Sequence, residues 1–209
     1  QKGEHLLIEV NDTGKELAKA LMEEAYLVGG KPFLWVKDQD LMRTFLMGAD
    51  QKQIELMGQW EANLMEKMQA YIAIRGNDNP SDLSDIPAEA KKNFQTYWSR
   101  VVHTDLRLAN TKWCVLRWPN PTMASHAKMS TQGFEDFYFD VCTLDYQKLE
   151  QAELPLKALF DRTKEVEIIG PGTHLKFSIE NIPTVMSYGL RNVPDGEVFT
   201  APVKDSVEG

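Results

Sequence analysis

The chain has 209 residues, of which 43% are hydrophobic and 26% charged, a composition typical of a globular protein and not of a disordered one. Its 31 acidic and 23 basic side chains give a formal net charge of −8, which argues against a general nucleic-acid binder or a protein held on an anionic membrane. This balance is still compatible with a small local basic pocket.

The cysteines and the apolar segments indicate the compartment. Cys114 and Cys142 are too few for a disulfide scaffold or a four-cysteine zinc site, and both lie in apolar stretches, so we expect buried thiols in a reducing compartment. No apolar run approaches the roughly 20 residues that a membrane-spanning helix requires, and no signal-peptide pattern opens the chain. These features predict a cytoplasmic protein.

The first 120 residues alternate between strand and helix patterns. A buried strand is predicted at residues 5–10, and the Asn-Asp-Thr run at 11–13 offers side-chain oxygens to cap the following amphipathic helix. A Gly-Gly pair at 29–30 supplies the left-handed stop, and a second strand is predicted at 32–36. Strand, helix and strand in this order predict a βαβ unit with parallel pairing.

The same alternation continues as far as residue 118. One helical stripe precedes a predicted strand at 70–74, and another precedes a predicted strand at 112–118, with a loop expected over 76–87. Both stripes are interpreted as core, and their members are Met57, Trp60, Leu64 and Met68 in the first and Phe94, Trp98, Val102 and Leu106 in the second.

Most of residues 122–163 has a helical pattern, and the character of the sequence then changes. A β-hairpin is predicted between 166 and 179, and two further β-like stretches follow it. We place a domain boundary near residue 163. Residues 1–163 are expected to form an N-terminal α/β domain with a mostly parallel sheet flanked by helices, and residues 164–209 to begin a second, β-rich α+β domain.

Motifs for nucleotide, zinc-helix or serine-hydrolase chemistry do not occur. The turn after the first strand, residues 9–14, has a single glycine, whereas a dinucleotide or phosphate loop needs several. No serine lies in a G-x-S-x-G turn. The four histidines are too scattered to form an H-E-x-x-H pair: His5, His103, His126 and His174. We interpret His103 as a packed or surface residue and His174 as a solvated one.

One carboxylate in the last segment is a candidate functional residue. Glu197 follows a Pro-Asp-Gly turn and precedes a short apolar strand, a setting that can direct a carboxylate into a cleft. The plainer interpretation is an exposed glutamate after a turn, and the physical pattern alone leaves both open.

Several long motifs resemble the M29 family of metalloaminopeptidases. The run NVPDGEVFTAPVKDSVEG at 192–209 is similar to the hallmark segment of that family. Three earlier runs resemble the family in the same order: TKWCVLRWP at 111–119, MSTQGFEDFYF at 129–139 and IGPGTHLKF at 169–177. The likeness spans essentially the whole chain.

The resemblance implies an exopeptidase that acts in the cytoplasm, as a homodimer, on peptides with a free N-terminus. It also implies two divalent metal ions (zinc, cobalt or manganese) bound by carboxylates and histidines, and the glutamate of the E-V-F-T-A-P motif matches Glu197. The family's other ligands and its catalytic tyrosine lie downstream, so we expect no catalytic residue within these 209 residues. Residues 164–209 are accordingly expected to be the truncated beginning of the metal-binding catalytic domain. The chain begins at Gln1 rather than Met, and we expect an N-terminal fragment that is inactive alone.

A second hypothesis belongs to another class. The chain could instead be a non-catalytic α/β module for binding or oligomerisation whose relatives are peptidases. The reading frame beyond Gly209 discriminates between the two. A continuation with His, Glu and Asp at metal-ligating positions favours the enzyme, and a stop codon favours the module.

Overall fold

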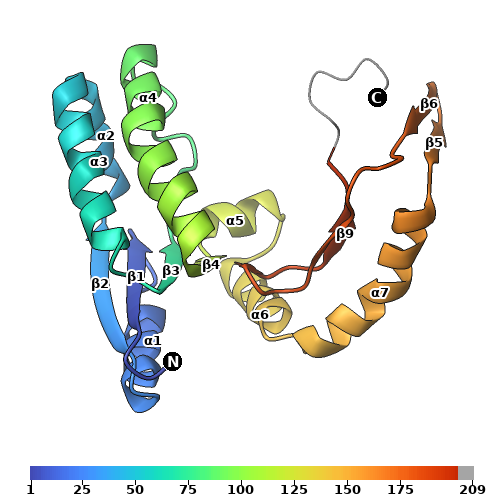
Figure 1. The fold of residues 1–209 in the computed structure, drawn as a ribbon, viewed down its shortest axis with the longest axis horizontal. Coiled ribbons are helices and arrows are strands. Elements are labelled where there is room, and N and C mark those ends of the chain that lie inside the picture. The colour runs from blue at the N-terminus through green and yellow to red at the C-terminus, as the bar shows by residue number, and fades with distance from the viewer. Residues whose placement is uncertain (202–209) are drawn as a thin grey trace. The chain divides into compact units, whose positions relative to one another are not determined.

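The computed structural model describes residues 1–201 and divides into two compact units, of which the second begins at Asp140 (Figure 1). Residues 202–209, at the end of the run that carries the family resemblance, lie outside the described residues. The division at residue 140 lies upstream of the domain boundary expected near 163, which stays a prediction.

Four parallel strands form the centre of the first unit. They pair in the order β2-β1-β3-β4. Their bounds are β1 (His5–Asn11), β2 (Lys31–Lys37), β3 (Ala70–Arg75) and β4 (Lys112–Arg117). The chain passes from β1 to β2 on one side and returns to β3 on the other, so the strand order reverses beside β1. The predicted α/β class with a mostly parallel sheet is confirmed.

Helices cover both faces of this sheet. Successive strand residues point to opposite faces. On one face α1 (Lys15–Leu27) packs on a core whose buried residues are Ile8, Val10, Ala18 and Ile74. On the other face α3 (Gln51–Met65) and η1 (Gln95–Leu108) enclose a second core, with buried residues Leu7, Met65, Met68, Tyr71, Ala73 and Val102. Trp98 and Leu106 pack against this second core, as their stripe predicts.

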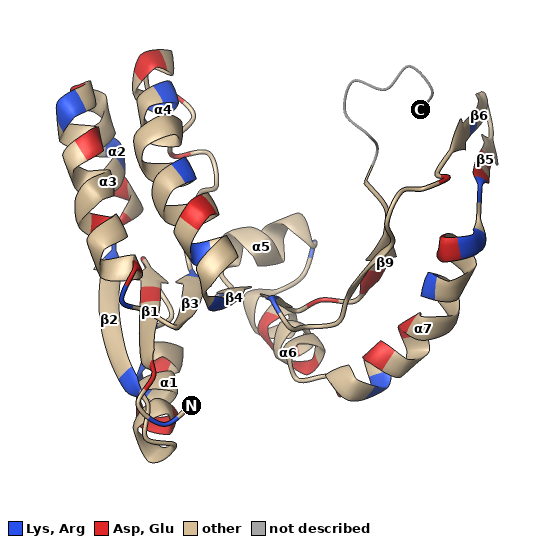
Figure 2. Ribbon diagram, viewed as in Figure 1, with Lys and Arg blue, Asp and Glu red and all other residues tan. Residues whose placement is uncertain are grey.

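Four further helices lie within residues 1–142. They are α2 (Gln39–Gly48), α4 (Ala88–Phe94), α5 (Pro121–His126) and α6 (Thr131–Cys142). The chain continues from α4 directly into η1, which has π-helical hydrogen bonding and is therefore wider than an α-helix. Acidic and basic residues are interspersed over the helices (Figure 2). Within residues 1–201, no helix is long and apolar enough to span a bilayer.

The second unit contains one long helix and short strands, most of which pair antiparallel. Helix α7 (Tyr146–Arg162) contains Pro155 and contacts the pair formed by β7 (Val185–Ser187) and β9 (Glu197–Phe199). The other strands are β5 (Glu165–Gly170), β6 (Thr173–Ser178) and β8 (Asn192–Val193). Strands β5 and β6 form the predicted hairpin.

The predicted side-chain cap of α1 is wrong. Helix α1 begins after Gly14, whose φ is 101°, and no side chain caps it. The Asp12 carboxylate instead accepts the backbone N–H of Gln39 at 2.8 Å, and the Thr13 hydroxyl donates to the carbonyl of Gly76 at 3.0 Å. These residues lie where several loops meet, so long-range partners replace the local helix cap.

The predicted buried stripe of α3 is wrong at Trp60, which is 71% exposed. The inward face consists of Ile54, Gly58, Glu61 and Met65. Glu61 faces inward because buried cations from β2 and η1 meet it there, and this turns Trp60 to the surface.

Replacing Gly58 with alanine is expected to lower the free energy of unfolding by about 1–3 kcal/mol, the usual cost of overpacking. A Cβ at Gly58 would lie 2.1 Å from the carbonyl oxygen of Tyr97, a backbone atom that cannot swing away. Urea unfolding measures the change. Gly48→Ala is the matched control, because a Cβ there meets nothing within 4 Å. Equal stability of the two variants would contradict the close approach of α3 and η1.

Candidate functional site

Glu197 is the first residue of β9, and its side chain is exposed. The preceding turn is held by Asp195, whose carboxylate accepts the backbone N–H groups of Gly189 at 3.3 Å and Gly196 at 3.1 Å. Gly196 has a φ of 149°, which a residue with a Cβ rarely adopts. Ser187 of β7 lies opposite Glu197 in the antiparallel pair. The turn and the strand pair together position the Glu197 backbone and leave its carboxylate accessible.

Glu153 of α7 is a buried acidic neighbour of this turn. Its side chain is 7% exposed, and within residues 1–201 neither of its carboxylate oxygens has a hydrogen-bond partner. Burial raises the pKa of Glu153, and the negative charges of Asp195 and Glu197 raise it further. A cation bound beside these carboxylates would reduce their repulsion.

A complete metal-ligand group is not found in the described part of the chain, where no three His, Cys, Asp or Glu side chains could hold one ion together. Two of the histidines, one in each unit, have other surroundings. His174 is exposed on β6, with its Nε2 2.6 Å from a carboxylate oxygen of Glu167. His103 belongs to η1 and lines a pocket of the first unit.

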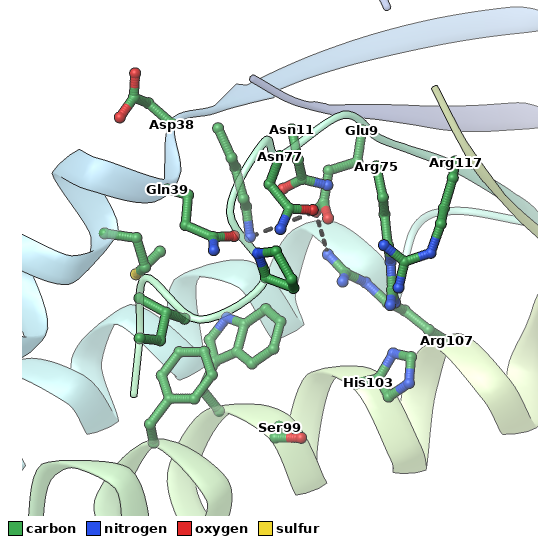
Figure 3. A pocket seen from close by; sticks show the side chains of 16 residues that line it. Glu9, Asn11, Asp38, Gln39, Arg75, Asn77, Ser99, His103, Arg107 and Arg117 are labelled. Atoms are coloured by element: carbon green, nitrogen blue, oxygen red, sulfur yellow. Dashed lines mark hydrogen bonds and ion pairs between the residues drawn. The ribbon is translucent and has the colours of Figure 1, made fainter. Parts of the chain in front are cut away.

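That pocket is a cavity of about 440 Å³ at the C-terminal edge of the parallel sheet (Figure 3). Residues from β1 and β3 line it where the strand order reverses. Open α/β sheets bind ligands at this type of position, and the volume lies in the range of small-molecule sites. Sequence reasoning did not anticipate this cavity.

A row of polar side chains crosses the sheet at this edge. In the strand register Lys37 pairs with Asn11, Asn11 with Arg75, and Arg75 with Arg117. Each is the last residue of its strand, and all four line the pocket. Figure 3 shows the two arginines of this row gathered at one end of the pocket with His103 and Arg107.

A buried ionic cluster lies next to the row and consists of Glu9, Lys37, Glu61 and Arg107. Glu9 accepts from Nη2 of Arg107 at 2.7 Å and from the hydroxyl of Tyr71 at 3.0 Å. Nζ of Lys37 donates to the two carboxylate oxygens of Glu61 at 3.0 and 2.9 Å, and lies 3.4 Å from Glu9. Burial opposes ionisation of Glu9, but the charges of Arg107 and Lys37 outweigh it and hold its pKa below the usual value.

His103 is half-buried between this cluster and solvent. Burial lowers its pKa, and the positive charges of Arg107 and Arg75 lower it further against the opposing effect of Glu9. Burial is thus the main cause of the lowered His103 pKa, and the neighbouring arginines add to it.

The family comparison agrees with the sequence motifs. The model of the family described as thermophilic metalloprotease (M29) matches residues 1–209. The chain belongs to the M29 family of metalloproteases. The resemblance in the four sequence runs is thus confirmed at the level of the family. A search of curated proteins found no significant match.

Membership of the M29 family implies a metal cofactor. The exposed carboxylate of Glu197 is suited to serve as one oxygen ligand of a divalent ion. The residues that the structure describes do not gather the further ligands that such an ion needs, so no reaction step is assigned to them.

Sequence reasoning singled out Glu197 in this M29 chain and missed the pocket residues. Lys37, Arg75 and Arg117 are isolated cations in the sequence, each within one residue of the end of a predicted strand. A signal was nevertheless present. Parallel strands end at one edge of their sheet, so polar residues at successive strand ends must meet there. Glu9 gave no such signal, because it lies inside a strand predicted as buried.

Proposed function

We propose that this chain is part of a metal-dependent aminopeptidase that removes single residues from the amino end of peptides, with two divalent ions among zinc, cobalt and manganese. The M29 family match over residues 1–209 carries the proposal. The accessible Glu197 carboxylate at the start of β9 supports its assignment as one metal ligand.

The proposed chemistry assigns separate tasks to the residues around the turn. Paired divalent ions, when bound, polarise the scissile carbonyl and lower the pKa of a bound water. Glu197 would donate a carboxylate oxygen to such an ion. Asp195 positions Glu197 through its hydrogen bonds to the turn, and the negative charge of Asp195 favours a cation beside it.

The proposal also covers the oligomeric state, the cellular location and the binding partners of the protein. We propose a cytoplasmic homodimer that acts on peptides with a free N-terminus and binds neither nucleic acid nor membrane. Residues 1–209 alone are proposed to be inactive, because a pair of ions needs several ligands and this chain offers Glu197. Size-exclusion chromatography with light scattering tests the dimer, and a monomeric gene product would contradict it.

The complete gene product should show metal-stimulated aminopeptidase activity. After chelation it is expected to release leucine and other residues from aminoacyl amides only when zinc, cobalt or manganese is returned. An N-acetylated substrate is the control, and it should resist cleavage because it lacks a free amine. Failure with all three metals would overturn the proposal and favour the non-catalytic module. Turnover by residues 1–209 alone would overturn their proposed inactivity.

A further inference from the structure

We propose that the pocket at the C-terminal edge of the parallel sheet binds a small phosphate monoester with an apolar body. The inference is carried by residues of the first unit and does not rest on peptidase activity. Three features carry it: two adjacent arginines that have no acidic partner within residues 1–201, two buried donors that have no acceptor there, and an aromatic wall.

The first feature is the Arg75–Arg117 pair. These residues lie directly opposite each other on β3 and β4, an arrangement of like charges that destabilises a strand pair. Both are exposed, and among residues 1–201 no carboxylate lies within ion-pairing distance of either. A phosphate between them would offset the repulsion, and the guanidinium fork suits bidentate contact with phosphate oxygens.

The second feature is a set of buried donors that lack acceptors. Arg107 is 2% exposed and lines the pocket, and its Nε has no hydrogen-bond partner within the part of the chain that the structure describes. The same holds for Nε1 of Trp98, another lining residue. An unmade hydrogen bond at a buried donor costs free energy. Both orphaned groups are donors, so the missing partner is an acceptor.

The charges already present in the pocket do not supply that acceptor. The carboxylate of Glu9 is engaged by Arg107, Lys37 and Tyr71. Lys37 is in turn neutralised by Glu61. Asp38 also lines the pocket, but its carboxylate caps α2 by accepting the N–H of Leu41 at 2.9 Å. Figure 3 shows Asp38 away from the arginines.

The third feature is the aromatic wall, which indicates the rest of the ligand. Phe94 and Trp98 stack with ring centroids 4.7 Å apart, and Met42 and Leu83 extend this apolar lining. A phosphate attached to a ring or short alkyl group would place its charge by the arginines and its body on this wall. A dianion matches two guanidiniums that lack a carboxylate partner within the described residues better than a singly charged carboxylate does.

Calorimetric titration of the 209-residue chain with phenyl phosphate tests the proposal. Binding is expected, with inorganic phosphate weaker because it lacks the ring and benzoate weaker because it carries one charge. Arg75→Gln and Arg117→Gln should each lower the phenyl phosphate affinity by about tenfold or more. Arg100→Gln is the matched control, since Arg100 is an exposed arginine of η1 outside the pocket lining. The affinity of this variant for phenyl phosphate should equal that of the parent chain.

The outcomes separate the possible ligand classes. No binding of phenyl phosphate at millimolar concentration, or equal affinity of the Arg75→Gln/Arg117→Gln double variant and the parent chain, would overturn the proposal. Benzoate binding as tightly as phenyl phosphate would replace the phosphate class by carboxylates. Both arginines are exposed at strand ends, so the variants are expected to keep the parent circular dichroism spectrum.

His103 supplies a second readout by NMR. The charged groups that face it are Arg107 on its own helix, Arg75 on β3 and Glu9 on β1, with Arg117 of β4 lining the same pocket. A bound dianion favours the imidazolium form, so phenyl phosphate should raise the His103 pKa from its lowered value. An unchanged His103 titration in the presence of saturating phenyl phosphate would place the ligand elsewhere and contradict the proposal.

Discussion

Replacing Glu9 with alanine is expected to lower the free energy of unfolding of this chain by about 3–5 kcal/mol, the usual cost of breaking a buried ion pair by removing one partner. The substitution leaves Arg107, which is 2% exposed, without its 2.7 Å partner. It also removes the acceptor of the Tyr71 hydroxyl. Urea unfolding followed by circular dichroism measures the loss.

Two further variants show that the loss comes from buried charge. Glu4→Gln removes a surface ion pair with Lys112 and is expected to change stability far less. The double variant Glu9→Leu/Arg107→Met removes both buried partners and should recover most of the loss, because apolar side chains can replace a buried pair. If Glu9→Ala lowered the free energy of unfolding no more than Glu4→Gln does, the stabilising role of the cluster would be contradicted.

Because the pKa of Glu9 is lowered, the stabilisation that this cluster provides depends on pH. A carboxyl whose pKa is lower in the folded state stabilises the fold above its unfolded value, 4.5. That contribution is lost as the pH falls through the folded pKa. The stability difference between the parent chain and Glu9→Ala should therefore be full at neutral pH and shrink in acid.

Replacing Glu197 with alanine in the complete gene product is expected to lower metal-stimulated kcat/KM by more than about 100-fold, the upper end of the loss seen when only an outer partner of a metal ligand is removed. Bound metal, measured by elemental analysis, should fall with it. The fold should persist, because the Glu197 side chain is exposed.

The matched control for Glu197 is Glu165→Ala. Glu165 is also an exposed glutamate at the start of a strand of the second unit, and it pairs on the surface with Lys176. It should retain full activity. A fully active Glu197→Ala enzyme would remove the ligand assignment, whereas loss of activity together with unfolding would show a structural role instead.

The periodicity of the sequence was sufficient to predict the parallel strands, because apolar runs separated by amphipathic helices have few other arrangements. It was not sufficient for features that depend on distant partners. Asp12 and Thr13 resemble helix caps in sequence, but their partners are Gln39 and Gly76. Glu61 resembles a surface residue, yet Lys37 and Arg107 make it an inward one.

The two candidate sites differ in how far the sequence predicts them, because one lies in a contiguous motif and the other is assembled from distant segments. Glu197 lies in a contiguous motif, so the sequence alone identifies it. The pocket is assembled from strand ends more than 20 residues apart, and Arg107 enters it from a helix. No short window contains this group of residues, and strand register is needed to bring them together.

The adjacency of Arg75 and Arg117 also constrains how the chain folds. A slip of β4 by one residue against β3 would turn its side chains to the opposite faces of the sheet. Arg117 would then point into the apolar core beneath α1, where Leu116 and Trp118 now pack. Burying an unpaired guanidinium there is costly. The charge of Arg117 therefore disfavours the slipped register and favours the correct alignment of β4 with β3.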